Sequence, residues 1–519
     1  MSPLAGLATL FACGSEPNGT LADYDKDDDG SAISEGDCND LDPAIGVTRP
    51  DAEGDGIDSD CDGSDGSLLR LTEVAVAIYH GGTLGGAFGH QVVAGPDLDS
   101  DGLGEFAVLA SEVYAPQPAG GTVFVLSFAG TGEHSLTQDD ALIVIVDSSE
   151  EIDDIAFVTP LAGGRLAAAC NTPDNIARMD GGVGLYLFDD PLRKGLGIVD
   201  ADGMLDTMTS GGPAVVASVG DLFGDGIDDV IIRGVQGSDL GASGVLWAID
   251  ADIQNVVEGD AAVVVDGWAD EDSFGDNVIG GDFNGDGLGD LVITGTGSDP
   301  LGRAEDPAII ILEGSPTLVE GADAFDAQTR VYASDVDAEY SLAHGGLAAG
   351  RVDVGAAEDL IVCDHVYNEP EPRCGRCWLD YGPLPRGDHP LEDFPVQFQP
   401  AFGGSMLGRQ AAIADYDGDG LGDVILAAPD DPYGSPVSAG RVYVWLAPFD
   451  AIETTDTADV AFKSDKPGDG AGSGLAASDL DGDGRAELLI GAPDVAQQDY
   501  YKLPETTGSV YVIAGGTGL

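Results

Sequence analysis

The stretch DYDGDGLGD at residues 415–423 decides the fold, because the chain repeats it. Close copies stand at 97–105 (DLDSDGLGE), 282–290 (DFNGDGLGD) and 479–487 (DLDGDGRAE). Weaker copies stand at 160–168 (PLAGGRLAA), 221–229 (DLFGDGIDD) and 351–359 (RVDVGAAED). The seven copies begin 61 to 69 residues apart, so one unit of about 60 residues recurs seven times. We number the units, and the nine-residue loop of each, from one to seven in chain order.

Each unit sets its loop between two short apolar strands, and a third strand follows about 15 to 25 residues later. The third strands are predicted at 121–128, 182–188, 244–249, 307–312, 376–381, 440–446 and 508–514. Their β-branched and aromatic residues are bounded by Gly and Asp, and no segment shows helical spacing. About four strands in a unit of this length form a propeller blade. The sequence therefore predicts an all-β fold, a seven-bladed β-propeller of four-stranded blades over residues 67–519.

The repeated motifs resemble FG-GAP repeats, the blades of integrin alpha-subunit propellers and of many bacterial surface proteins. The resemblance rests on Phe274-Gly275, the Asp loops, Gly491-Ala492-Pro493 and the strand GSVYVIA at 508–514, and it covers about residues 70–519. It implies a ring of seven blades.

The same resemblance implies where the ring closes and where it binds. Segment 71–80 would complete the last blade, which would remove a free sheet edge. Calcium loops would lie on one face and ligands would contact the other. Longer inserts at 296–306 and 364–400 are then where we expect a partner to bind.

The spacing of the loop residues predicts calcium sites. In D-x-D/N-x-D-G-x-x-D/E, side chains at positions 1, 3 and 5 converge around the turn at position 6, position 7 adds a carbonyl and position 9 a carboxylate. Such a set of hard oxygens suits Ca²⁺ better than Mg²⁺. The alternative is an Asp-Gly hairpin turn without metal. The predicted ligands are Asp97, Asp99, Asp101, Leu103 and Glu105; Asp282, Asn284, Asp286, Leu288 and Asp290; Asp415, Asp417, Asp419, Leu421 and Asp423; and Asp479, Asp481, Asp483, Arg485 and Glu487.

The three weaker loops differ from one another. Loop three has Phe223 at position 3 and keeps Asp221, Asp225 and Asp229, so whether it binds calcium stays open. Loops two and five lack most ligands and are predicted to be metal-free turns. Without metal, the clustered carboxylates of the complete loops repel one another, so calcium should contribute to stability.

Residues 23–66 form a separate module that is dense in Asp, Gly and Ser and poor in core-forming residues. Such a segment needs metals or a disulfide to fold. Asp25, Asp27 and Asp29 repeat the calcium-loop opening, and Asp37 or Glu35 would close the site. The alternative is a flexible acidic linker.

This module also resembles a metal-binding motif that is repeated in many bacterial secreted proteins, through DCND-x-DP followed by DGIDSDCDG. The resemblance implies that Cys38 and Cys61 are disulfide-bonded to each other.

Residues 1–22 read as a signal-like segment and linker. The run Leu10-Phe11-Ala12-Cys13 resembles a bacterial lipoprotein signal, in which the Cys is lipidated. Chance similarity is the alternative, because no basic residue precedes the apolar run. We expect a protein that is extracellular or at the cell surface, in contact with a membrane only through such an anchor at Cys13.

The cysteines of unit five lie on neighbouring predicted strands. Cys363, His365, Cys374 and Cys377 match the ligand types of a zinc site. In an exported protein a disulfide from Cys363 to Cys374 or Cys377 is favoured instead.

The charge of the chain excludes one class of partner. It has 94 acidic and 20 basic residues, a formal net charge of −74, so nucleic acid would be repelled. Part of this charge serves the predicted metal loops, and part is a soluble, acidic surface.

No nucleophile elbow, HExxH or phosphate loop occurs, so the sequence favours a binding protein over an enzyme. We expect a monomeric, calcium-loaded propeller that adheres to or recognises an extracellular protein or glycan. An extracellular polysaccharide hydrolase or lyase on a propeller scaffold, and a passive coat protein, are the alternatives.

Overall fold

The structure is a computed structural model, and all its described residues fall in one compact unit that comprises 68–432 and 437–519. The described residues are 68–81, 88–95, 97, 101–110, 122–128, 131–136, 143–146, 154–161, 165–171, 183–188, 203–207, 215–224, 226, 228–236, 243–250, 263–266, 275, 277–295, 308–316, 322–323, 328–332, 345–365, 367, 375–400, 406–429, 440–464, 468–493 and 508–518.

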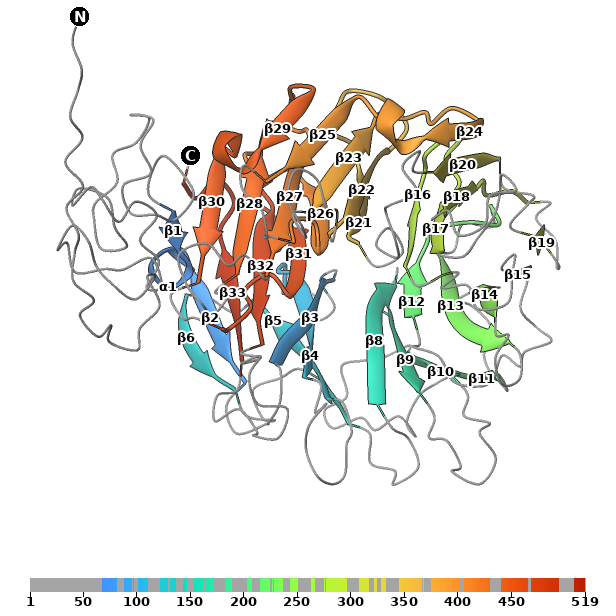
Figure 1. The fold of residues 1–519 in the computed structure, drawn as a ribbon. Coiled ribbons are helices and arrows are strands. Elements are labelled where there is room, and N and C mark those ends of the chain that lie inside the picture. Colours follow the sequence, from blue (N-terminus) through green and yellow to red (C-terminus); the bar gives the residue numbers. More distant parts are fainter. Residues whose placement is uncertain are drawn as a thin grey trace, which may run out of the picture. The chain divides into compact units, whose positions relative to one another are not determined.

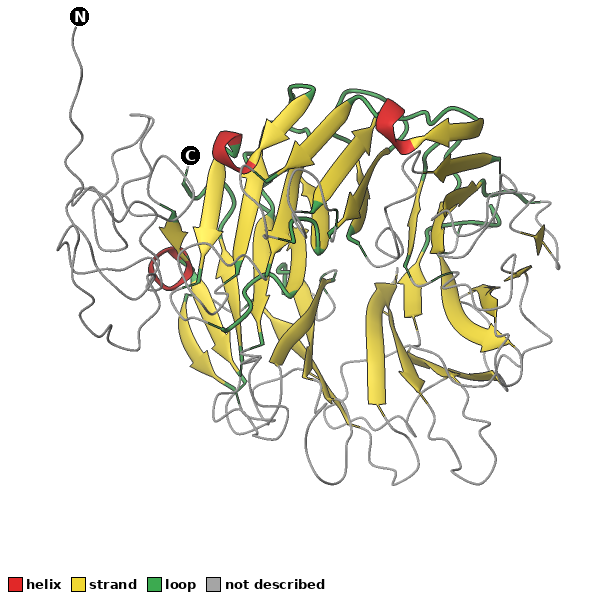
Figure 2. Cartoon of the chain, in the orientation of Figure 1, coloured by secondary structure: helices red, strands yellow, loops and turns green. Residues whose placement is uncertain are grey.

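Strands dominate these residues, and they form seven sheets (Figure 1; Figure 2). The first two sheets hold β3 (Phe88–Ala94), β4 (Glu105–Ala110), β5 (Thr122–Ser127) and β7 (Ile143–Val146), then β8 (Asp154–Leu161), β9 (Arg165–Asn171), β10 (Val183–Phe188) and β11 (Gly203–Thr207). The third holds β12 (Val215–Ser218), β13 (Asp229–Gln236), β14 (Ser243–Asp250), β15 (Val263–Asp266) and β19 (Ala322–Asp323). The fourth holds β16 (Val278–Gly281), β17 (Asp290–Gly295), β18 (Ala308–Leu312), β20 (Thr329–Tyr332) and β24 (Gly387–Pro390).

The last three sheets follow the same plan. The fifth holds β21 (Leu347–Gly350), β22 (Asp359–Asp364), β23 (Arg376–Asp380), β25 (Val396–Gln399) and β29 (Ile452–Thr454). The sixth holds β26 (Gln410–Ala414), β27 (Asp423–Ala428), β28 (Arg441–Trp445), β30 (Val460–Lys463) and β1 (Leu69–Arg70). The seventh holds β31 (Gly474–Ser478), β32 (Glu487–Ala492), β33 (Ser509–Ile513), β2 (Ala77–His80) and β6 (Gly132–Ser135). Helical residues in the described part are α1 (Leu71–Val74) and the short 3-10 turns η6 (Leu391–Asp393) and η7 (Thr455–Thr457).

The first strands of the sheets lie against one another. In chain order, β3 contacts β8, β8 contacts β12, and the series continues through β16, β21 and β26 to β31, which contacts β3 again. Small residues permit this approach: a Cβ on Gly350 of β21 would lie 2.6 Å from Ile413 Cγ2 of β26. The all-β propeller class predicted from the sequence is therefore what the chain adopts.

The core lies between adjacent sheets. Ile425 and Val442 of the sixth sheet pack with Leu488, Ile490 and Tyr511 of the seventh, and each is at most 1% exposed. The second strand of a blade is covered on both faces, which is why DVILAA in β27 and ELLIGA in β32 are apolar without alternation. Fully burying one such side chain is worth about 1.5–3 kcal/mol.

The strand β2 completes the seventh sheet from the other end of the chain. It pairs antiparallel with β33, with Tyr79 opposite Val510. Segment 71–80 was expected to supply this strand, and its second half does so, while Leu71–Val74 forms α1.

A fifth strand covers the outer edge of five sheets, and in each case it runs parallel to the fourth. The strands β19, β24, β29 and β6 come from the connection between the third and fourth strands of the following blade. The strand β1, which precedes β2, pairs with β30 in the same way. Each pairing ties a blade to its neighbour and protects an edge.

The interpretation of 364–400 as a long insert is wrong for most of its length. Residues 376–399 supply β23, the edge strand β24 and the fourth strand β25 of the fifth blade. The segment reads as a loop because the short strand Gly387–Pro390 gains its partner from the preceding blade.

Candidate metal centres

The nine-residue loops connect the first and second strands of their blades. Loop six joins β26 to β27, and loop seven joins β31 to β32. Gly418 and Gly420 have φ of +82° and +93°, which only glycine adopts without strain, so the fourth and sixth positions set the turn. The sequence pattern therefore specifies the loop backbone before any metal binds.

The first aspartate of each complete loop organises this backbone. Asp415 Oδ1 accepts from the N–H groups of Gly418 (2.7 Å) and Asp419 (3.0 Å), and its Oδ2 accepts from Gly420 N–H (2.9 Å). Asp282 and Asp479 make the same three bonds in loops four and seven. Asp97 binds the N–H groups of Asp101 and Gly102.

The fifth position holds the next peptide. Asp419 Oδ1 accepts from Leu421 N–H at 2.8 Å, and the same bond joins Asp101 to Leu103, Asp286 to Leu288 and Asp483 to Arg485. The fifth residue is itself held by the third: Asp417 and Asp481, and Asn284 in loop four, each accept from its N–H at 2.8–3.1 Å. These bonds fix the position 7 peptide whose carbonyl is the predicted ligand.

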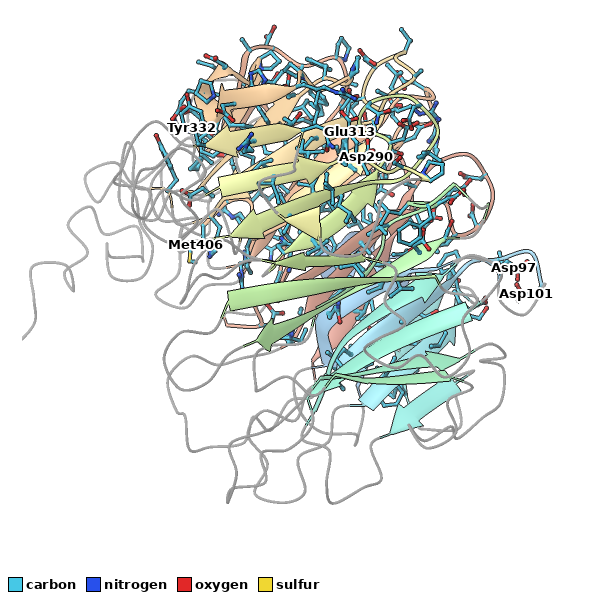
Figure 3. All side chains as sticks on the ribbon, turned by 90° about the vertical axis from the view of Figure 1, so that its right-hand side faces the viewer. Asp97, Asp101, Asp290, Glu313, Tyr332 and Met406 are labelled. Carbon is cyan, nitrogen blue, oxygen red and sulfur yellow. A yellow bond between two sulfur atoms is a disulfide. The ribbon has the colours of Figure 1, made fainter. Side chains whose placement is uncertain are left out.

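Three loops gather carboxylates closely enough to hold a cation. In each loop, three carboxylate oxygens lie within 4.8 Å of one another, from Asp97, Asp101 and Glu105; from Asp415, Asp417 and Asp423; and from Asp479, Asp481 and Asp483. Figure 3 shows Asp97 and Asp101 together on their loop. In loop four, Asn284 Nδ2 donates to Asp290 Oδ1 at 3.2 Å. The donor sets are all hard oxygens, which fits calcium.

The carboxylate at position 9 has a structural role that the sequence did not indicate. Asp423 Oδ2 accepts from Tyr416 N–H (2.8 Å) and its Oδ1 from Ala447 N–H (3.0 Å). This joins the loop to the end of the third strand.

We call this pair of hydrogen bonds, made by the position 9 carboxylate to its own loop and to the end of the third strand, the bracket. The same bracket recurs in other blades. Asp290 joins Phe283 to Gly314, and Glu487 joins Leu480 to Gly515. In loop five Asp359 joins Val352 to Gly382, although that loop has no aspartate at position 1. Position 9 therefore builds the blade whether or not a metal is present.

Burial changes the pKa of the position 9 carboxylates. Burial raises the pKa of Asp290 to about 7 and that of Asp423 to about 6, and the aspartates nearby add to the rise. Burial also raises the pKa of Glu487 and of Asp359. Asp290, Asp359 and Asp423 are each at most 1% exposed, so an ionised carboxylate here depends on its N–H donors or on a cation.

Adjacent loops are joined directly through their backbones. The N–H at position 8 donates to the carbonyl at position 1 of the preceding loop, as Ala486 does to Asp415 (2.7 Å) and Gly422 to Arg351 (2.7 Å). Glu358 bonds to Asp282 and Gly289 to Asp221 in the same way, and Gly104 of loop one bonds to Leu480 of loop seven. These bonds link loops three to seven in series, and loop seven to loop one.

The incomplete loops show what remains without the ligands. In loop three Asp221 binds Gly224 and Gly226 N–H, and Asp229 binds Leu222 N–H, so the frame persists despite Phe223. In loop five Arg351 occupies position 1, and Val354 at the tip is 93% exposed. We keep the prediction that loop five is free of metal.

Cys363 and Cys377 form a disulfide between β22 and β23. The predicted disulfide of unit five is confirmed, with Cys377 as the partner, and the zinc interpretation is wrong because both thiols are used. The bridge packs against Gly408 of the next blade, where a Cβ would collide with both sulfurs.

Several predicted residues lie outside the described part of the chain. They are Asp99, Asp225, Cys374, residues 296–306, and the N-terminal set of Cys13, Asp25, Asp27, Asp29, Glu35, Asp37, Cys38 and Cys61. Within the described part, no helix is long and apolar enough to cross a membrane.

The FG-GAP repeat model matches residues 407–445 and 471–513, which span loops six and seven with their strands. These two segments of the β-propeller are therefore FG-GAP repeats.

A curated relative, rat phosphatidylinositol-glycan-specific phospholipase D, is 34% identical over 119 residues. The match covers 21% of this chain and only 13% of that protein. Among solved structures, the Dos1 propeller (10% identity, TM-score 0.44) aligns with 86% of this chain and 97% of its own. Sqt1 from Chaetomium thermophilum (11% identity, TM-score 0.44) aligns with 85% and 98%.

Proposed function

We propose that this FG-GAP propeller is a calcium-binding recognition module, in which loops one, four, six and seven each hold one Ca²⁺. Its partner would be an extracellular protein or glycan, and the chain would act as a monomer that is secreted or held at the cell surface. The observation that carries the proposal is the same arrangement at equivalent places in separate blades: a first aspartate that organises the turn, and further carboxylates converging above it.

Electrostatics support a stabilising role for the ion. Each complete loop places three or four acidic residues within nine positions, on a chain with net charge −74. A divalent cation would remove the repulsion among these carboxylates and would stabilise the folded state by about 2.7 kcal/mol per site at a hundredfold excess over Kd.

A thermal unfolding series tests the proposal. In about 1 mM CaCl₂ the protein should melt several degrees higher than in EDTA. MgCl₂ should restore less of this stability than CaCl₂. The control replaces the position 5 aspartates Asp101, Asp286, Asp419 and Asp483 with Ala, and this variant should melt alike in both buffers. Equal melting temperatures of the wild type in calcium and EDTA would refute the proposal.

The recognition role needs its own experiment, because the loops occupy one end of each blade and the partner is expected at the other. Pull-down from extracellular material with the wild type and with the quadruple Ala variant should recover a common partner, more weakly with the variant. If neither protein retains a partner on glycan and surface-protein arrays, a passive coat role is favoured.

An enzymatic role is the second hypothesis, and the name of the rat relative is what favours it. That relative is a phospholipase D specific for phosphatidylinositol glycans, and the chain spans a small part of it. Hydrolysis of phosphatidylinositol-glycan or polysaccharide substrates by the purified chain would establish this alternative.

A further inference from the structure

Arg485 departs from the pattern of the loops. It occupies position 7 of loop seven, where loops one, four and six have Leu103, Leu288 and Leu421. It is one of only 20 basic residues in the whole chain, and it stands in one of the most acidic segments.

The side chain at position 7 lies over position 4 of the preceding loop. A Cβ on Gly224 of loop three would lie 3.2 Å from Leu288 Cδ2 of loop four, and one on Gly285 would lie 3.6 Å from Ala357 Cβ of loop five. Arg485 is placed in the same way: a Cβ on Gly418 of loop six would lie 2.9 Å from its Cγ and 3.1 Å from its Nε. Arg485 thus belongs to loop seven and covers loop six.

The surroundings of Arg485 hold its side chain beside loop six. Gly418 stands between Asp417 and Asp419, and on its other side Arg485 lies against Gly515 and Gly516 of the C-terminal turn. Tyr416 of loop six donates its hydroxyl to Thr517 O at 2.7 Å, which holds this turn beside the loop.

Packing alone does not explain a charged residue here. Within the described part of the chain the guanidinium has no recorded hydrogen bond or ion pair, and the one polar contact of the residue is its backbone N–H to Asp483 Oδ1. Leucine occupies the equivalent place in three other loops, so the aliphatic stem suffices to cover the glycine.

We infer that Arg485 is a tethered cation that tunes calcium binding by loop six, an inference that rests on the proposed calcium binding. Without calcium, its charge offsets the repulsion among the carboxylates of Asp415, Asp417 and Asp423. When calcium binds, the two cations repel each other. Loop six therefore binds calcium more weakly than it would with leucine at position 485, and it depends less on calcium for its order.

Calcium titration of the full chain, in competition with a chelator of known affinity, tests the inference. R485M, which keeps the stem and removes the charge, should tighten one site by about two- to fivefold at low salt, the size expected for exposed charges in water. The difference should shrink near 1 M salt, and R485K should bind calcium like the wild type.

Combining R485M with a second substitution, D483A or D419A, shows which calcium site Arg485 affects. R485M should still tighten binding in D483A, where loop six is intact, and should have no effect in D419A, where it is not. R409M is the matched control, because it removes one positive charge at the end of β26 that lies away from loop six, and its isotherm should equal that of the wild type.

A second readout does not need calcium. In EDTA, R485M should melt below the wild type and R485K should not. An unchanged isotherm in R485M, a change that persists in D419A, or an R485K that behaves as R485M would each overturn the inference. A wild type that takes up no calcium would instead refute the proposed function, so the two failures are distinct.

Discussion

Loops five and six are neighbours that share one structural carboxylate but differ in their turn and in their chemistry. Gly418 and Gly420 of loop six have positive φ, and Val354 and Ala356 at the same positions of loop five do not. Both carry the buried bracket at position 9, Asp359 in one and Asp423 in the other, and Gly422 N–H of loop six bonds to Arg351 O of loop five. Loop six opens with Asp415 where loop five has Arg351. The comparison teaches that position 9 builds the blade in both loops, whereas the aspartates at positions 1 and 5, which the proposed ion would need, are present only in loop six.

The largest expected effect comes from removing the bracket where no ion is expected. Asp359→Ala would leave the N–H groups of Val352 and Gly382 without their acceptor in a buried site, at a cost of about 2–4 kcal/mol. Urea unfolding should give the same loss in calcium and in EDTA. A loss seen only in calcium would mean that loop five binds the ion, and the contrast between the loops would fail.

A smaller effect, with a different signature, is expected in loop six. Asp419→Ala should lower the unfolding free energy in calcium by about 2–3 kcal/mol, because one ligand set is broken. In EDTA the same change should cost little, since Asp419 is exposed and one fewer negative charge remains in the cluster. Equal losses in the two buffers would indicate a purely structural role for position 5.

The smallest effect concerns pH in the metal-free protein. The folded-state pKa values of Asp290, about 7, and of Asp423, about 6, lie above the ordinary value of 3.8, so the folded state takes up protons before the unfolded state does. Stability in EDTA should therefore rise by about 1–2 kcal/mol as pH falls from 8 to 6, and it should be lost again as pH rises. Urea unfolding at each pH measures this.

In calcium, stability should instead fall as the pH falls, because protons compete with the ion for the same oxygens. The D290N and D423N variants should show a flatter pH profile in EDTA. A profile that falls on acidification in EDTA would contradict the assignment of these groups.

Much of the blade was predictable from local sequence. The strands around DVILAAPD and ELLIGAPD can be predicted directly from their apolar runs, and the glycines of the complete loops indicate the turn of those loops. The closing strand at 77–80 followed from the family resemblance.

The features that the sequence did not show depend on contacts with segments that are distant in the sequence. The edge strands Gly387–Pro390 and Ile452–Thr454 have little strand character of their own and form by pairing with the preceding blade. The bracket at Asp359 was invisible for the same reason, because Gly382, its second donor, comes from the far end of another strand. The packing of Arg485 over Gly418 likewise joins two units about 60 residues apart in sequence.

Anomalous diffraction from crystals grown in calcium tests the central claim most directly, because it shows where each ion lies. The account predicts an ion in loop six bound by Asp415, Asp417, Asp419, Asp423 and the carbonyl of Leu421. It predicts related ions in loops one, four and seven, and none in loop five. An empty loop six in calcium-saturated crystals, or an ion in loop five, would contradict it.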